Sequence, residues 1–122
     1  MEFNEYQAAA KTTALYLDEV KKTFKNLPEG IIKMLGVSYA GLGMGEVGEV
    51  QGKVKKIIRD CGGILTEKHK EEIKKELGDC LWYIAAMCTE LDIDMNTVAE
   101  ANIKKLFSRK ERNVLKGSGD NR

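Results

Sequence analysis

The 122-residue sequence has only one proline, only three cysteines and no long apolar run. The shortage of proline leaves long stretches free to form helices, and a composition of 43% hydrophobic and 32% charged residues excludes a disordered chain. Charged residues interrupt every apolar run within about ten residues, so we expect no signal peptide, no membrane span and a cytoplasmic location. The length favours one domain over residues 1–122.

The three cysteines do not indicate a metal or redox site. They form no C-x-x-C pair, and Cys80 and Cys88 share one apolar stripe, so we interpret them and Cys61 as packed, reduced thiols rather than metal or redox groups. The sole histidine, His69, is predicted to lie on the surface.

Apolar residues recur at three- and four-residue steps in four segments, which predicts four amphipathic helices and no strand. The tail, residues 116–122, has no such period and is predicted to be flexible. We therefore predict an all-α fold with a four-helix-bundle type of protomer. The predicted helices begin after Asn4, near Val37, after Thr66 and after Asp94.

Glycines crowd the start of the second predicted helix. Gly43, Gly45 and Gly48 have the G-x-G-x-x-G spacing of a dinucleotide loop, but no strand precedes them, and Glu46 and Glu49 would repel a pyrophosphate there. Because glycine inside a helix costs about 1 kcal/mol relative to alanine, we expect another backbone to approach the glycine face closely. The alternative is a broken, partly unwound helix. The glycines that share this face are Gly41, Gly45, Gly48 and Gly52.

Two acidic pairs, Glu46 with Glu49 and Glu76 with Asp79, lie at three-residue spacing beside apolar stripes. Packing of their helices would make the four carboxylates converge, and two such charges about 5 Å apart repel by about 3 kcal/mol at an effective dielectric near 20. Cations between them would remove this repulsion, and an all-oxygen ligand set selects Mg²⁺ or Mn²⁺. A di-iron site would need E-x-x-H pairs, which His69 does not form.

Three segments carry a family resemblance: GEVGEV, ELGDCLWYIAA and VAEANIKKLFSRKER. They resemble the MazG-like nucleoside triphosphate pyrophosphohydrolases, in an all-α superfamily that also holds dimeric dUTPases, dCTP pyrophosphatases and phosphoribosyl-ATP pyrophosphatases. The resemblance covers nearly the whole chain. It implies a homodimer or homotetramer, Mg²⁺ on Glu46, Glu49, Glu76 and Asp79, and cleavage of a nucleoside triphosphate to the monophosphate and pyrophosphate.

The last predicted helix supplies basic groups. Asn102 and Lys105 match residues that the family places against the triphosphate, and with Arg109 they share one helix face beside the apolar stripe. Lys53 either contacts phosphate or pairs with Glu49, and Tyr83 is predicted to line the pocket. Lys105 and Arg109 would offset charge on the leaving pyrophosphate.

One carboxylate should orient or deprotonate the attacking water, and we assign this role to Glu49. Trp82 points away from its apolar stripe, which favours contact with another subunit over stacking on a base.

Two readings outside the enzyme class stay open. From Lys104 to Arg122 seven basic residues face two acidic ones, which suits a nucleic-acid-binding bundle, although the acidic pairs oppose it. The other is a non-catalytic regulatory bundle. Within the superfamily, a dedicated dCTP, dUTP or phosphoribosyl-ATP hydrolase is also open.

Overall fold

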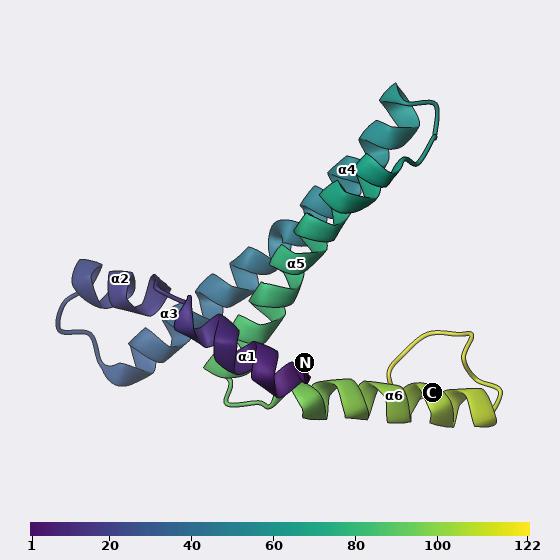
Figure 1. Ribbon diagram of the computed structural model, residues 1–122. Coiled ribbons are helices and arrows are strands. Elements are labelled where there is room, and N and C mark those ends of the chain that lie inside the picture. The colour runs from purple at the N-terminus through teal and green to yellow at the C-terminus, as the bar shows by residue number, and fades with distance from the viewer.

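The computed structural model describes residues 1–122 and contains helices but no strand, which confirms the all-α prediction. The four predicted segments are all present, but the first and second are each interrupted (Figure 1). None of the helices is both long enough and apolar enough to cross a membrane. The elements are α1 (Phe3–Thr12), α2 (Tyr16–Thr23), α3 (Glu29–Gly43), the 3₁₀ turn η1 (Met44–Glu46), α4 (Val47–Asp60), α5 (Glu67–Glu90) and α6 (Met95–Glu111).

The first predicted helix breaks between α1 and α2. The Thr12 hydroxyl donates to the Ala9 carbonyl at 2.7 Å, and the Thr13 hydroxyl donates to the Ala10 carbonyl at 2.8 Å. Side chains of this type compete with the backbone for its hydrogen-bonding groups and favour helix ends. The prediction of one continuous helix was wrong, because apolar residues keep their helical spacing through the break and therefore do not reveal it.

The second segment begins at Glu29, directly after Pro28, and so starts earlier than predicted. Our expectation of a close backbone along the glycine face was wrong within this chain, because a Cβ added at Gly45, Gly48 or Gly52 would meet nothing within 4 Å. The alternative of a broken helix is confirmed by η1, which interrupts the segment between α3 and α4. The segment is not unwound there, because a 3₁₀ turn is wound more tightly than an α-helix. The glycine that does allow a close approach is Gly43, where a Cβ would collide with the ring of Tyr83.

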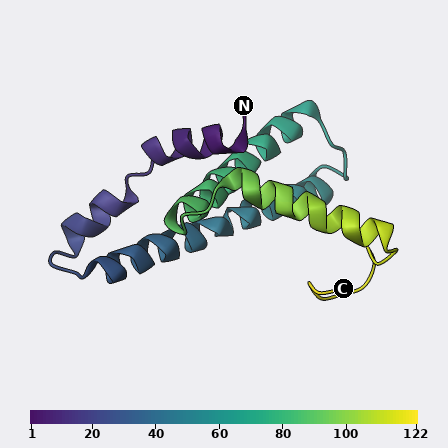
Figure 2. The same ribbon diagram turned by 90° about the horizontal axis from the view of Figure 1, so that it is seen from below.

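The helices α4 and α5 run side by side as an arm that projects from the rest of the protein (Figures 1 and 2). A turn over Cys61, Gly62 and Gly63 joins them at the tip, with both glycines at positive φ, 60° and 76°. The Thr66 hydroxyl accepts a hydrogen bond from the His69 amide at 3.3 Å, which confirms Thr66 as the cap of α5. Of the three cysteines, Cys80 and Cys88 are buried as predicted, whereas Cys61 is exposed in the turn.

Helix α6 leaves the base of the arm in a different direction and packs chiefly against α1 (Figure 1). Gln7 ties the two together: its side-chain amide donates to the Ile93 carbonyl and its oxygen accepts from the Met95 amide, both at 2.9 Å. The apolar face of α6 is open to solvent within one chain, although an amphipathic helix usually buries this face. Its members Val98, Ile103, Leu106 and Phe107 are 37–59% exposed.

Only 12 of the 122 residues are buried, so the core of one chain is small. One cluster joins α1, α5 and the start of α6 around Ala85, and the other joins α2, α3 and α5 around Ala40. Both clusters lie at the base of the arm, beside the end of α5 that carries Trp82 and Tyr83.

Candidate functional site

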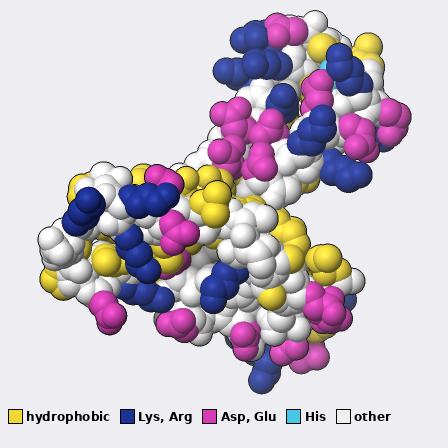
Figure 3. Space-filling view, turned by 60° about the vertical axis from the view of Figure 1, so that its left-hand side comes forward, with side chains coloured by type: hydrophobic (Ala, Val, Ile, Leu, Met, Phe, Trp, Pro, Cys, Tyr) yellow, Lys and Arg dark blue, Asp and Glu magenta, His cyan; other side chains and the backbone are white.

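Three of the four predicted carboxylates meet where η1 packs against α5. Glu46 ends η1, and Glu76 and Asp79 lie one turn apart on α5, so the packing of these two elements brings them together. Each offers one oxygen, and these oxygens all lie within 4.8 Å of one another. Acidic side chains are seen gathered along the arm in Figure 3. We call Glu46, Glu76 and Asp79 the carboxylate group.

The carboxylate group fits a hard divalent cation. All three atoms that the group offers are carboxylate oxygens, and two of the three side chains are only partly exposed. The cation beside them is Lys53, which pairs with Glu76. Charges this close repel one another, and a bound Mg²⁺ or Mn²⁺ would convert the repulsion into attraction. These residues are therefore the ones that would hold such an ion.

Glu49 and Lys53 flank the carboxylate group on α4. Glu49 is exposed and does not join the three-oxygen cluster, so its predicted ligand and base roles stay predictions. Lys53 does not pair with Glu49; its Nζ lies 3.7 Å from Oε1 of Glu76, where both side chains are partly buried at 35% and 19% exposure. Lys53 thus sits at the edge of the carboxylate group, where a bound anion would reach it.

A cavity of about 470 Å³ opens beside the carboxylate group and includes Glu46 and Asp79 in its wall. Tyr83 also lines it, as predicted for this residue's position. Burial, followed by the neighbouring Tyr39 hydroxyl and the charges of Glu46 and Asp79, raises the pKa of Tyr83 above its usual value.

Helix α1 contributes to this region through Tyr6. Tyr6 packs against the core cluster around Ala85, and burial followed by the charge of Asp79 raises its pKa. Gln7, on the same helix, points instead to the turn between α5 and α6.

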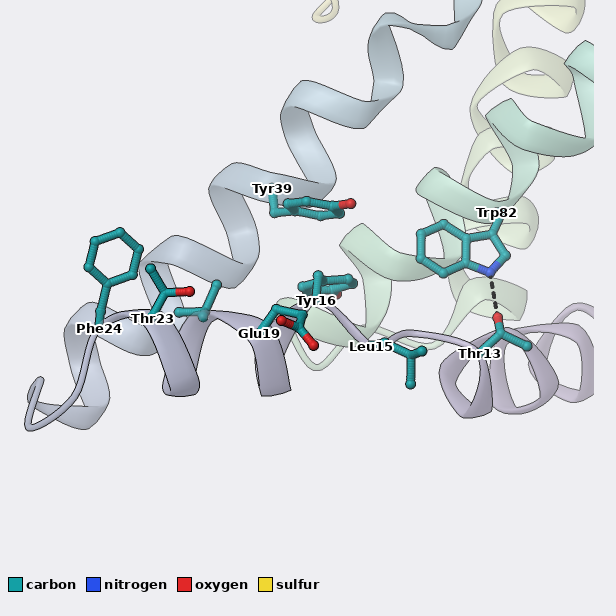
Figure 4. A pocket seen from close by; sticks show the side chains of 9 residues that line it. Thr13, Leu15, Tyr16, Glu19, Thr23, Phe24, Tyr39 and Trp82 are labelled. Carbon is teal, nitrogen blue, oxygen red and sulfur yellow. Dashed lines mark hydrogen bonds between the residues drawn. The ribbon is translucent and has the colours of Figure 1, made fainter.

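Trp82 also lines this cavity and makes contacts that we had not predicted. Its indole N–H donates to the Thr13 hydroxyl at 2.8 Å (Figure 4), and its ring packs edge-on against Tyr16 and Tyr83. Trp82 therefore packs within its own chain, where we had considered only a second subunit or a base. The break between α1 and α2, which puts Thr13 in reach, is a long-range feature that the local sequence around Trp82 does not signal.

Comparisons with known proteins bear directly on this site. The sequence profile of the MazG nucleotide pyrophosphohydrolase domain matches residues 38–114, more than half of the chain. The chain belongs to the MazG family. The matched range contains the carboxylate group, Glu49 and the basic face of α6, and it leaves out α1, α2 and the tail.

One relative is similar over its full length. The Gene 37 protein of Mycobacterium phage L5 is 40% identical over 128 aligned residues, which cover 100% of this chain and 100% of that protein. The name of that protein does not describe an activity. No solved structure matches the chain.

The predicted phosphate-binding residues on α6 of this MazG domain do not lie at the carboxylate group within one chain. Asn102 and Lys105 are exposed on α6, a helix that packs chiefly against α1 and not against α4 or η1. The structure therefore brings together the acidic part of the predicted site but leaves the predicted phosphate-binding helix apart from it.

Arg109 differs from its two predicted partners because it is buried. The folded-back tail covers it: one guanidinium nitrogen donates to the Asp120 carbonyl at 2.9 Å, while Nε is buried without a partner. Arg122 closes the tail by donating to the Gly119 carbonyl at 2.6 Å. The tail thus lies against α6 here, and its predicted flexibility stays a prediction.

His69 is held in the arm's tip, away from the carboxylate group. Its Nδ1 accepts from the Thr66 amide at 3.2 Å, and its Nε2 lies 3.8 Å from the Cys61 sulfur. It is partly exposed, and its role in the structure is to cap α5.

Proposed function

We propose that this MazG protein hydrolyses a nucleoside or deoxynucleoside triphosphate between the α and β phosphates, releasing the monophosphate and pyrophosphate. The observation that supports this most strongly is the cluster of three carboxylate oxygens within 4.8 Å, beside a cavity of about 470 Å³. Family membership supports the reaction class. The base and sugar of the substrate stay open, and dCTP, dUTP and phosphoribosyl-ATP are all candidates.

The proposed metal ligands are Glu46, Glu49, Glu76 and Asp79, with Mg²⁺ as the physiological ion and Mn²⁺ as a substitute. When bound, such an ion neutralises charge on the phosphates and lowers the pKa of a coordinated water. Glu49 is the group proposed to orient that water and accept its proton, and its solvent exposure leaves it free to do so. Lys53, already 3.7 Å from Glu76, then turns to the phosphates.

Asn102, Lys105 and Arg109 are proposed to bind the triphosphate, with Lys105 and Arg109 offsetting charge on pyrophosphate as it leaves. For Arg109 this role requires the tail that covers it to move away. Because α6 stays apart from the carboxylate group within one chain, we propose that these residues act on the site of a neighbouring copy. The proposed assembly is a homodimer or homotetramer. It rests on the small core and on apolar side chains left exposed along α3, α4 and α6: Met34, Leu42, Val47, Ile58, Ile103 and Phe107.

The proposed location is the cytoplasm, where nucleoside triphosphates and Mg²⁺ are available. A non-catalytic bundle is the rival, and it leaves the convergence of three carboxylates without a purpose. A nucleic-acid-binding bundle is disfavoured because the same carboxylates would repel a phosphodiester backbone.

The test is pyrophosphate release from a panel of canonical and modified nucleoside triphosphates, with and without Mg²⁺. Wild type should release pyrophosphate only with the metal, and Glu46→Gln should remove this activity. The control is Glu71→Gln, an exposed α5 carboxylate paired with Lys74, which should behave as wild type. Absence of release from every substrate would contradict the proposal and favour the regulatory bundle.

A further inference from the structure

After α6 the chain turns back and runs alongside the end of this helix (Figures 1 and 2). The turn begins at Asn113, whose φ is 56°, and the tail continues through Gly117 and Gly119, whose φ values are 117° and 88°. Glycine adopts such values without the strain that a side chain would cause. The residues of the tail therefore suit a tight, folded-back conformation.

The last residue of the chain holds the tail in this position. The Arg122 guanidinium donates to the carbonyl oxygens of Val114 at 3.2 Å, Leu115 at 3.3 Å and Gly119 at 2.6 Å. The carbonyl oxygen of Arg122 accepts a further bond from Arg112 at 3.0 Å. Replacement of the Arg122 side chain alone would therefore remove three of the hydrogen bonds that close the tail.

The closed tail covers Arg109, which is only 5% exposed. One terminal nitrogen of its guanidinium donates to the Asp120 carbonyl at 2.9 Å and to the Gly119 carbonyl at 3.5 Å. The carboxylate of Asp120 lies 3.8 Å from the same nitrogen. The tail thus presents to Arg109 the kind of oxygen atoms, one of them charged, that a phosphate would present.

This cover leaves Arg109 incompletely bonded. Its Nε is buried and has no hydrogen-bond partner within the chain. A buried donor without an acceptor destabilises the state in which it occurs. Phosphate oxygens accept charge-assisted, often bidentate bonds from a guanidinium, and these are stronger than bonds to neutral carbonyls. An oxyanion is therefore able to compete with the tail for Arg109.

We propose that the tail is an autoinhibitory cover of Arg109, a proposal that rests on the function proposed above. With the tail closed, the guanidinium is held by oxygens of its own chain and does not reach a triphosphate at the carboxylate group of a neighbouring copy. Productive binding requires an open tail, so the observed affinity is lowered in proportion to the open fraction. The tail thereby raises the triphosphate concentration at which the protein becomes active.

The first test measures pyrophosphate release by full-length wild type and Arg122→Ala. Loss of the Arg122 hydrogen bonds should increase the open fraction, lower KM for the triphosphate by about tenfold and leave kcat unchanged. The matched control is Lys116→Ala, which removes the same charge from an exposed position in the tail and should keep the KM of wild type.

A chemical measurement reports on the tail without hydrolysis. Phenylglyoxal modifies accessible guanidinium groups, and peptide mass spectrometry gives the initial rate at each arginine. Arg109 should react about tenfold faster in Arg122→Ala than in wild type or Lys116→Ala. The exposed Arg59 should react at one rate in all three proteins. An α,β-methylene analogue of ATP with Mg²⁺ should slow the reaction of Arg109 in Arg122→Ala.

Two results would overturn the proposal. Equal initial rates at Arg109 in wild type and Arg122→Ala would show that the tail does not cover this residue. A higher KM in Arg122→Ala would show that the tail helps to bind the substrate. The two proposals are also separable: faster modification of Arg109 without hydrolysis by any variant would reject the proposed function and support the cover, whereas hydrolysis with an unchanged KM would reject autoinhibition alone.

Discussion

The carboxylate group and the basic face of α6 are built differently. Packing of η1 and α4 on α5 draws the three carboxylates to within 4.8 Å, so the acidic part needs only one chain. The basic face instead lies on a helix whose apolar side is exposed and which packs chiefly against α1. The difference shows that one chain brings the acidic part of the candidate site together, whereas the predicted phosphate-binding residues of α6 lie apart from it. This is why we propose that they act on the site of another copy.

Neutralising Asp79 should have the largest effect, because it removes a ligand from the acidic part. If the ligand set supplies several kcal/mol of transition-state stabilisation through the metal, Asp79→Asn should lower kcat/KM by about 10³-fold. Steady-state pyrophosphate release measures this, with Asp92→Asn as the control because Asp92 is exposed and pairs with Lys33. Equal activity of wild type and Asp79→Asn would show that the carboxylate group is not a metal site.

A variant of Glu49 distinguishes the carboxylates that mainly bind the metal from the one that is proposed to act as the base. Since it lies outside the three-oxygen cluster, Glu49→Gln should lower kcat by about 10²-fold while changing Mn²⁺ affinity much less than Glu46→Gln does. Metal titration and kcat on the two variants measure both quantities. A loss of metal affinity as large as that of Glu46→Gln, with kcat at saturating metal unchanged, would leave Glu49 as a ligand and contradict its proposed role as the base.

Mixed oligomers test whether the basic part comes from another copy. Glu46→Gln and Lys105→Ala should each be at or below about 1% of wild-type activity. When the two variants are mixed and their subunits exchange at random, about a quarter of the wild-type activity should return. Half of the dimers then contain one subunit of each variant, and each such dimer has one intact site of two. Failure to recover activity on mixing, with both parents correctly assembled, would place α6 and the carboxylates of one chain at the same site.

The smallest expected effect concerns Tyr16 and Glu90 in the base of the arm. Burial and the hydrogen bond to Glu90 raise the pKa of Tyr16 above its usual 10.0, so its contribution to stability is complete below pH 10 and is lost as the pH rises above it. Tyr16→Phe should cost about 1–3 kcal/mol at neutral pH, because Glu90 then lacks its donor. Urea unfolding measures the difference in unfolding free energy between wild type and Tyr16→Phe, which should become smaller above pH 10. A difference that stays constant with pH would show that ionisation of Tyr16 does not affect stability.

Local signals account for the parts of the fold that could be predicted. The Thr66 cap, the Cys-Gly-Gly turn and the spacing of Glu76 and Asp79 each depend on residues a few positions apart, and the structure has all of them. The family resemblance added the reaction class, which the MazG match confirms at the level of the family.

Long-range contacts account for what could not be predicted. The apolar period from Phe3 to Phe24 hides a break that places Thr13 under Trp82, sixty-nine positions away. Glu90 looks like an ordinary charged residue at a helix end, and its burial depends on both Tyr16 and Gly36. The exposed position of α6 depends on its packing chiefly against α1, which periodicity within one helix does not reveal.

Hydrolysis in ¹⁸O-labelled water, with Mg²⁺ and a nucleoside triphosphate, tests the central claim most directly. The account predicts monophosphate and pyrophosphate as products, with the label in the monophosphate because water attacks the α-phosphorus, and no turnover by Asp79→Asn. Formation of the diphosphate with label in inorganic phosphate, or turnover that persists in Asp79→Asn without metal, would contradict it.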